Sequence, residues 1–282
     1  MALTINTNMA SMLVQRNMTS STKALNTAIQ RMTTGYRINS AKDDAAGMAV
    51  AIKLDTQLGA YDVASQNVQM GASLLTTLEE NDNLVLGHLQ RIRDLAEQCA
   101  NGVYDDTSKD AIKAEIDARL EEIDRLSGSV EFNGIKLMDG VKTINIQVGI
   151  NGGADDRINV GTATGNTTKE ALLKVTGSGG YDFSTGALIK ANPTDALAKI
   201  DTAIGTMKTR ITSIGALQNR LDSAAESIEV ARSNVSSALS TVRDADISTE
   251  SSNYIRAQIL QQAAASLLTT ANQSPSIALN LI

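Results

Sequence analysis

Apolar residues recur at alternating three- and four-residue steps along the C-terminal third of the chain. The steps join Leu197, Ile200, Ile204, Met207, Ile211 and Ile214, and the pattern resumes beyond Leu217 after one extra three-residue step. This spacing is typical of a helix that buries one stripe against another helix. Asn192-Pro193-Thr194 is the predicted start, and residues 194–243 alone would extend roughly 75 Å at ~1.5 Å per residue. A helix of this length needs a second long helix as its partner.

The N-terminal half of the chain contains candidate partner helices. Residues 3–32 form a predicted polar helix whose thin apolar stripe comprises Met9, Leu13, Leu25, Ile29 and Met32. Such a helix is only marginally stable in water by itself, so we expect it to order against a partner. Gly35 is the predicted stop of this helix, and an irregular connector follows over residues 37–42.

A second, longer helix is predicted to begin at Asp43-Asp44, because acids suit the N-cap and the first turn of a helix. Its apolar heptads run from Gly71 to Cys99 with Asp82 as an interruption, and Asn101-Gly102 is the predicted stop. A third helix is predicted over residues 108–126. Its apolar stripe comprises Ile112, Ile116, Leu120 and Ile123.

The middle of the chain changes from a helical to a strand-like period. Apolar residues alternate at Val130 and Phe132 and again over residues 144–148, and Asn133-Gly134 is a turn signal. These features predict a small β-hairpin region. Residues 149–191 are rich in Gly, Thr, Asn and Asp, which predicts a loop-rich segment with one further hairpin over residues 172–183.

A separate C-terminal helix is predicted over residues 248–270, after the acids near Asp244 and Asp246. Its stripe of Ile255, Ile259, Ala263 and Leu267 resembles the thin stripe of the first helix. We expect an assembly seam in which these residues face the N-terminal helix or neighbouring copies. The seam comprises Leu13, Leu25, Ile29, Met32, Ile255, Ile259, Ala263 and Leu267.

The predicted fold class is therefore mainly α. We expect a long antiparallel helical rod, a coiled-coil or helix-bundle hairpin of the N- and C-terminal segments, with the small β-hairpin region at its far end. Composition favours the same fold: of 282 residues 42% are hydrophobic, but only 2% are aromatic, two are proline and none is tryptophan. Ala, Leu, Ile and Met suit narrow helix–helix seams better than a wide globular core.

Charge and the remaining composition exclude several classes of partner. The net charge of −6, with both signs interspersed, argues against nucleic-acid binding, which needs a basic face. The N-terminal residues lack the basic start and apolar run of a cleavable signal, and no stretch reaches the ~18 apolar residues of a membrane span. The single cysteine, Cys99, excludes an internal disulfide and a cysteine-based zinc site.

Candidate catalytic chemistry is sparse. His88 is the sole histidine and adjoins a seam position, so we interpret it as a partly exposed helix residue. Ser20-x-x-Lys23 matches a nucleophile pattern by spacing only, and its companion motifs are missing. The paired acids, such as Glu79-Glu80, are interpreted as solvated helix faces. We therefore predict a structural or interaction protein rather than an enzyme, without a metal or cofactor.

Several longer strings resemble one known family, bacterial flagellin. They are Ile5-Asn6-Thr7-Asn8, Gln15-Arg16-Asn17, residues 35–47 (GYRINSAKDDAAG), Glu131-Phe132-Asn133-Gly134, Ile146-Gln147-Val148-Gly149 and residues 271–275 (ANQSP). The resemblance covers residues 1–149 and 190–282 and keeps the order of the strings. Cys99, Ser276 and Ala278 depart from the usual family pattern.

The resemblance implies a subunit of the filament that propels swimming bacteria. Residues 1–44 and 246–282 would form a terminal coiled-coil domain lining the inner tube. Residues 45–149 and 190–245 would form a helical rod domain in the outer tube, and residues 150–189 a reduced variable surface region. The family also implies self-assembly into a helical homopolymer, secretion by the flagellar type III apparatus, and contacts with an export chaperone, cap and hook-junction proteins. The expected location is the extracellular filament.

A receptor site is also implied by the resemblance. The string at residues 89–98 looks like the segment with which flagellins engage the flagellin-sensing Toll-like receptor of a host, and Glu115 matches a supporting acid on the next helix. The expected contacts are Leu89, Gln90, Arg91, Leu95, Gln98 and Glu115. Spacing places Arg91, Leu95 and Gln98 on a stripe separate from the seam.

Two other functions keep the same helical architecture. A hook–filament junction protein shares related terminal helices, although the full N-terminal string and the short chain favour flagellin. A helical scaffold that forms no filament is the alternative from a different class, and electron microscopy of the purified protein would separate it from both. Metalloprotease insertions of some large flagellins need the string H-E-x-x-H, which this sequence lacks.

Overall fold

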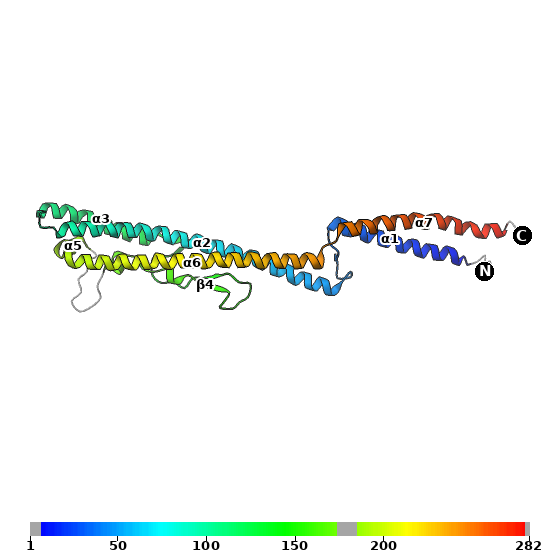
Figure 1. The fold of residues 1–282 in the computed structure, drawn as a ribbon, viewed down its shortest axis with the longest axis horizontal. Coiled ribbons are helices and arrows are strands. Elements are labelled where there is room, and N and C mark those ends of the chain that lie inside the picture. Colours follow the sequence, from blue (N-terminus) through cyan, green and yellow to red (C-terminus); the bar gives the residue numbers. More distant parts are fainter. Residues whose placement is uncertain (1–6, 174–184, 280–282) are drawn as a thin grey trace. The chain divides into compact units, whose positions relative to one another are not determined.

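The computed structural model describes residues 7–173 and 185–279, and these are mainly helical as predicted (Figure 1). The helices are α1 (Met9–Thr34), α2 (Ala45–Ala100), α3 (Asp106–Ser129), α4 (Lys169–Leu173), α5 (Gly186–Ala191), α6 (Pro193–Arg243) and α7 (Ile247–Leu279). The strands are β1 (Glu131–Phe132), β2 (Ile135–Lys136), β3 (Asn145–Gln147) and β4 (Arg157–Asn159), followed by a 3-10 turn at Gly161–Ala163.

Local chemistry explains where the long helices begin and end. The carboxylate of Asp44 accepts a hydrogen bond from the backbone N–H of Gly47 at 2.9 Å, which satisfies one of the free donors at the start of α2. Asp105 caps α3 in the same way. Pro193 occupies the first position of α6, where its missing N–H costs nothing. Gly35 ends α1 at a φ of 75°, a conformation that favours glycine.

The chain divides into two compact units, of which the larger is Gly59–Arg232. Its core consists of two clusters that join α2 to α6. One cluster combines residues 85–96 with residues 196–207, and the other combines residues 64–78 with residues 214–228. The two helices therefore run antiparallel, and the prediction that the long C-terminal helix pairs with a long N-terminal one is confirmed.

Two small antiparallel sheets lie in this unit. β1 and β2 pair through Asn133-Gly134, whose φ values of 49° and 77° are those of a type I′ turn, so the predicted hairpin is confirmed. β3 lies within the predicted strand-like residues 144–148 and pairs with β4, which lies in the segment that was expected to be loop-rich. The hairpin predicted over residues 172–183 is wrong at its first positions, because Leu172 and Leu173 belong to α4. Residues 174–184 of that prediction lie outside the described residues.

Side chains of α3 fix the start of both short helices. Asp124 accepts a hydrogen bond from the backbone N–H of Lys169 at 2.9 Å and pairs with its ammonium group at 3.2 Å. Asp117 accepts from the backbone N–H of Gly186 at 2.7 Å. The two acids are seven residues apart, so they lie on one face of α3. Short helices have little intrinsic stability. α4 and α5 depend on these contacts with α3, and because such contacts leave no periodic pattern in the sequence, the two helices were not predicted.

The second unit comprises Met1–Leu58 and Ser233–Ile282. In it α1 and α7 pack side by side and antiparallel (Figure 1). Three contacts fix their register: Arg31 with Glu250, Thr22 with Gln261, and Asn8 with the carbonyl of Ala271. We call this pair the terminal helix pair.

The connectors of the second unit are hydrogen-bonded to each other. Tyr36 bridges to Asp244, the N–H of Arg37 donates to the carbonyl of Arg243 at 2.7 Å, and the N–H of Ala245 donates to the carbonyl of Gly35 at 2.8 Å. The guanidinium of Arg243 also lies 4.0 Å from the centre of the Tyr36 ring. The predicted three-part division of the chain into tube and surface domains stays a prediction.

Candidate functional site

The seam of the terminal helix pair uses small and polar residues. On α7 the residues turned toward α1 alternate by three and four positions and comprise Glu250, Tyr254, Ala257, Gln261, Ala264, Leu268 and Ala271. On α1 they comprise Val14, Met18, Ser21, Leu25, Ala28 and Met32. Only Ala28, Glu250, Ala257 and Ala264 of these are fully buried. Alanine side chains bury little apolar area, so this seam contributes little stability compared with a seam of leucines.

The predicted assembly seam is therefore correct at some positions and wrong at others as a description of the helix pair. Leu25 and Met32 lie in the seam and are half-buried. Leu13 and Ile29 on α1 are exposed instead. On α7 the whole predicted stripe is exposed: Ile255 is 51%, Ile259 59% and Leu267 59% accessible, and Ala263 is also exposed. The alternative that these residues face neighbouring copies stays a prediction.

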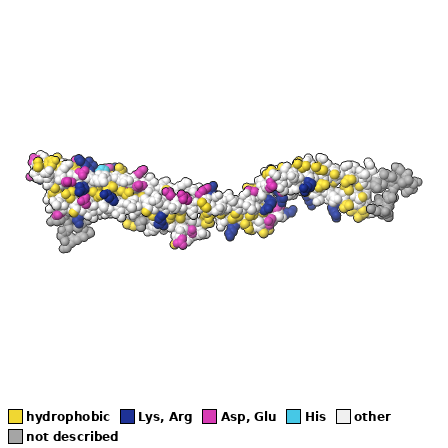
Figure 2. Space-filling view, viewed as in Figure 1, with side chains coloured by type: hydrophobic (Ala, Val, Ile, Leu, Met, Phe, Trp, Pro, Cys, Tyr) yellow, Lys and Arg dark blue, Asp and Glu magenta, His cyan; other side chains and the backbone are white. Residues whose placement is uncertain are grey.

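A groove runs along one side of the terminal helix pair. It consists of two hollows, of about 360 and 350 Å³, that share Ser20, Ser21 and Leu260. The hollow nearer the chain termini is lined by uncharged residues only: Val14, Asn17, Ser20, Ser21, Leu260, Ala263, Ala264 and Leu267. Small side chains on both helices leave this side concave, and the exposed Leu260 and Leu267 stand at its edge. Figure 2 shows apolar side chains on the exposed surface of this unit.

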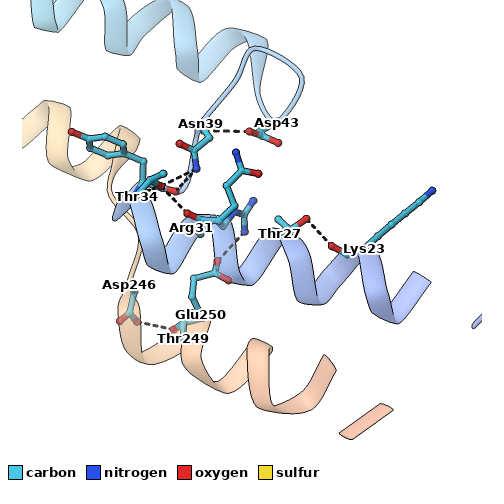
Figure 3. Close-up of polar contacts among 11 residues, drawn as sticks. Lys23, Thr27, Arg31, Thr34, Asn39, Asp43, Asp246, Thr249 and Glu250 are labelled. Carbon is cyan, nitrogen blue, oxygen red and sulfur yellow. Dashed lines mark hydrogen bonds and ion pairs between the residues drawn. The ribbon is translucent and has the colours of Figure 1, made fainter. Parts of the chain in front are cut away.

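Charged groups gather at the connector end of the groove (Figure 3). Arg31 pairs with the buried carboxylate of Glu250 at 2.8 Å and ties α1 to α7 there. Asp246 caps α7: hydrogen bonds from the Thr249 hydroxyl and the Ser248 N–H lower its pKa. Hydrogen bonds from Ser40, with a further one from the Asn39 N–H, lower the pKa of Asp43. The acids at the helix starts thus remain ionised and hold the connectors.

The expected receptor site lies on α2 and α3 of the larger unit. The Nε of Arg91 donates to Glu115 at 3.1 Å, and Arg119 contacts the same carboxylate oxygen at 3.0 Å. Hydrogen bonds from Arg119 and then from Arg91 lower the pKa of Glu115. The three side chains are partly exposed and form a positively charged cluster across the two helices.

The remaining expected receptor contacts lie in different environments. Gln90 is exposed and Gln98 is half-buried. Leu89 and Leu95 are 0% and 1% accessible and belong to the core between α2, α3 and α6. The expectation that Leu95 lies on an exposed stripe with Arg91 is therefore wrong, because α3 and α6 bury neighbouring faces of α2. These leucines cannot contact a partner without unfolding the core.

A buried ion pair was missed by sequence reasoning. Asp82, which interrupts the heptads of α2, is 0% accessible and pairs with the Nε of Arg210 on α6 at 2.7 Å. Burial raises the pKa of Asp82 to about 6, although the charge of Arg210 opposes the shift. Arg210 also donates from Nη1 to the carbonyl of Gly165 at 2.9 Å and so holds the segment that precedes α4. The only sequence signal was an acid at a seam position.

His88 and Cys99, the sole histidine and the sole cysteine of the chain, both lie on α2. Burial lowers the pKa of His88, with the nearby charge of Arg119 acting in the same direction. Cys99 is buried, which raises the pKa of its thiol. Across residues 7–173 and 185–279, no three His, Cys, Asp or Glu side chains are grouped so that they could hold a metal ion. No helix in the same ranges has the length and apolar character of a membrane span.

Comparison with known sequence families gives two matches in the expected order. Residues 5–143 match the family described as the bacterial flagellin N-terminal helical region. Residues 197–282 match the family described as the bacterial flagellin C-terminal helical region. Together the matches cover well over half of the chain and leave the segment around β3, β4, α4 and α5 outside them.

Individual relatives agree with these matches. A flagellar filament 30.7 kDa core protein of Treponema maltophilum is 31% identical over 99% of this chain and 99% of its own length. A flagellin of Xenorhabdus nematophila is 36% identical over the full length of both chains. A flagellin of Salmonella typhimurium is 39% identical over 79% of this chain, which spans only 44% of that protein.

Among solved structures, a putative flagellar hook-associated protein from Vibrio parahaemolyticus has a similar fold. Its TM-score is 0.60 at 17% identity, and the match covers 72% of this chain and all of that chain. At this identity the likeness concerns the fold alone. This chain and the Vibrio parahaemolyticus protein share an architecture of long helices. The fold alone therefore does not distinguish a filament subunit from a junction protein.

Proposed function

This chain belongs to the bacterial flagellin family, a family of structural proteins of the flagellar filament, and we propose that it polymerises with copies of itself into that filament. The filament is extracellular and acts as the propeller for swimming. One observation carries the proposal: the terminal helix pair leaves Ile255, Ile259 and Leu267 exposed on a single helix. Apolar side chains exposed in a row need a partner, and in this family the partner is another subunit.

The two ends of the chain have a definite place in this proposal. Residues 1–44 and 246–282 form the inner tube, where their exposed apolar side chains meet neighbouring copies. Residues 45–149 and 190–245 form the outer tube around it, and residues 150–189 form the variable surface. The complete core of the larger unit suits an outer tube, because that unit is stable without neighbours.

The same proposal includes the route by which subunits reach the filament. We take from the family that the chain is secreted by the flagellar type III apparatus, escorted by an export chaperone and added beneath a cap, onto hook-junction proteins. A chain whose one cysteine can form no internal disulfide is suited to export in an unfolded form, since no covalent link within the chain has to be broken first.

Electron microscopy tests polymerisation directly. The purified full-length chain should form helical filaments, and a variant that ends at Asp246 should remain monomeric while circular dichroism shows that the larger unit is folded. Both results follow if α7 supplies the contacts between subunits. A full-length chain that stays monomeric under polymerising conditions would instead support a helical scaffold, and short, capped assemblies would support a junction protein.

A second function rests on the charged face of α2 and α3. We propose that the monomer binds the flagellin-sensing Toll-like receptor through Gln90, Arg91 and Gln98, with Glu115 orienting Arg91. The ion pair of Arg91 with Glu115 at 3.1 Å supports this role, since it presents an arginine in a fixed orientation. Leu89 and Leu95 act indirectly by holding α2 in the core. The same face packs against the next subunit in the filament, so only monomer binds.

Binding of Arg91→Ala monomer to the receptor tests this second function. Truncation of an arginine at the centre of an interface costs about 2 kcal/mol or more, which is a loss of roughly thirtyfold in affinity. Arg93→Ala is the matched control, because Arg93 is similarly exposed on α2 but pairs with Asp201 of α6. Equal affinity of the two folded variants would remove Arg91 from the site without changing the family assignment.

A further inference from the structure

The terminal helix pair carries a groove and a ridge on different faces, and this arrangement fits head-to-tail contacts between copies. We propose that the groove beside Ser20 and Ser21 receives Ile255 and Ile259 from α7 of a second copy. The inference rests on the proposed self-assembly and specifies which surfaces of the terminal helix pair meet. In this contact, α7 of the second copy packs against both α1 and α7 of the first copy.

The shape of the two surfaces supports this match. The groove has small side chains on both walls, with Ser20, Ser21 and Ala24 on α1 and with Ala263 and Ala264 on α7. Small residues let the backbone of a third helix approach closely. Ile255 and Ile259 lie four residues apart, so they form one continuous ridge, and such ridges pack into grooves between residues of a facing helix.

The ridge formed by Ile255 and Ile259 does not lie in the groove of its own copy. Ile255 and Ile259 are absent from the lining of both hollows, although Leu260 and Leu267 of the same helix stand at the groove edge. Among the described residues of their own chain, Ile255 and Ile259 remain 51% and 59% exposed. A contact between unlike patches on two identical chains cannot form a symmetric dimer, and it builds an open helical polymer when its rotation does not close into a ring.

Charge favours α7 over α1 as the occupant of the groove. The ridge on α7 is flanked by the uncharged Ser251, Ser252, Gln258 and Gln262 and by Arg256, and α7 carries one acid, Glu250, against this one base. The hollow nearer the termini is also lined by uncharged residues. The outer face of α1 carries Met9, Met12, Arg16 and Lys23 at helical spacing, and α1 has no acid at all. Docking that face onto a groove that already has Arg31 and Arg256 at one end would bring like charges together.

Disulfide trapping tests the contact in the polymer. In a Cys99→Ala background, chains with Ser20→Cys are mixed in equal amounts with chains carrying Ile255→Cys or Ile259→Cys, polymerised, and oxidised with copper phenanthroline. We expect a cross-linked dimer of the two different chains on a non-reducing gel. Dispersed monomers at the same concentration should give at least ten times less of it. Mixing two different chains excludes links within one copy.

Asn26→Cys in place of Ser20→Cys is the matched control, because Asn26 is exposed on α1 outside both hollows. It should give no dimer with either ridge position. Filaments in which Ser20→Cys links to neither Ile255→Cys nor Ile259→Cys would overturn the proposed contact and leave the polymerisation proposal intact. Absence of filaments from the unmodified chain would overturn the polymerisation proposal and this contact with it.

A second variant measures how much the groove contributes. Ser20→Trp fills the groove where its two hollows meet and should raise the concentration needed for polymerisation about tenfold or more, which corresponds to about 1.4 kcal/mol per subunit contact. Asn26→Trp adds the same side chain outside the groove and should change this concentration less than twofold. Equal effects of the two variants would contradict the groove as a contact site.

Discussion

The larger unit and the terminal helix pair are both built from long antiparallel helices, but they distribute apolar side chains in opposite ways. In the larger unit leucines and isoleucines such as Leu78 and Ile92 are completely buried between helices. In the terminal helix pair the fully buried positions of the seam are mainly alanines, and several large residues such as Ile255, Ile259 and Leu267 face outward. One region therefore buries its large apolar residues between its own helices, whereas the other leaves many of them exposed, where the proposed contacts with other chains would use them.

Placing a charge on the outward face of the terminal helix pair should have the largest effect. We expect Ile259→Asp to abolish filament formation, because burying an unpaired carboxylate in an apolar contact costs more than the roughly 2–7 kcal/mol of burying an unpaired amide or hydroxyl. The isolated chain should keep its melting temperature, since Ile259 is exposed. Electron microscopy and thermal melting provide the two measurements. Gln258→Asp on the adjacent face is the control, and normal filaments of Ile259→Asp would refute the assignment.

Limited proteolysis should separate the two regions next most clearly. Brief protease treatment of monomer should remove both terminal segments and leave a resistant fragment of about residues 45–245, because a thin seam opens often. In the polymer the same segments should be protected, since contacts between subunits lower the population of the open form. Mass spectrometry of the fragments gives the boundaries. Equal protection of monomer and polymer would contradict the comparison.

Matched leucine truncations quantify the difference in packing. Leu78→Ala in the larger unit should lower the free energy of unfolding by about 2–5 kcal/mol, because Leu78 is fully buried and its loss leaves a cavity. Leu25→Ala in the seam of the terminal helix pair should cost less than about 1 kcal/mol in monomer, because Leu25 is half-buried. Urea unfolding followed by circular dichroism measures both. Similar losses would mean that the seam is packed as tightly as the core.

The smallest expected effect is a pH dependence confined to the larger unit. The pKa of Asp82 is raised from its ordinary value of 3.8 to about 6 in the folded chain, so the folded state holds this proton more tightly than the unfolded state. The contribution of Asp82 to the free energy of unfolding therefore falls as pH rises from about 4 to about 6 and is constant above.

Comparison of the wild type with Asp82→Asn isolates this contribution. The difference in free energy of unfolding between the two should shift in favour of the variant as pH rises through this window, whatever the offset from loss of the ion pair. Asp62→Asn is the control, because Asp62 forms an exposed ion pair with Arg232. If the difference in free energy of unfolding between wild type and Asp82→Asn did not change with pH, the charge of Arg210 would fully offset the effect of burial on the pKa of Asp82.

The sequence predicted the long helices well because their buried stripes are apolar. Ile200, Ile204 and Met207 alternate at seam spacing and are all buried. In the terminal helix pair the buried stripe is not the most apolar one. The buried apolar positions of its α7 seam are Ala257 and Ala264, which hydropathy hardly distinguishes from a polar face, whereas the predicted stripe of larger residues is exposed. In the terminal helix pair the most apolar stripe of α7 is therefore not the one that packs against α1.

Tertiary contacts account for what the sequence could not predict. Asp82 was visible as an interruption, but its partner Arg210 lies 128 residues further along the chain. The short helices α4 and α5 lack a periodic pattern and depend on caps from α3. The charged cluster on α2 and α3 was predicted in part, since Arg91 and Glu115 are in contact, but burial of Leu95 depends on how α3 and α6 pack.

The two caps on α3 also determine how the chain can vary in length. Asp124 holds Lys169 and Asp117 holds Gly186, so both ends of the intervening segment are fixed on one helix face whatever lies between them. The entropy of closing such a loop rises only with the logarithm of its length, by about 0.6 kcal/mol per doubling. Long sequences can therefore be inserted between these two anchors at small cost, which makes this position a natural carrier for foreign peptides or whole domains.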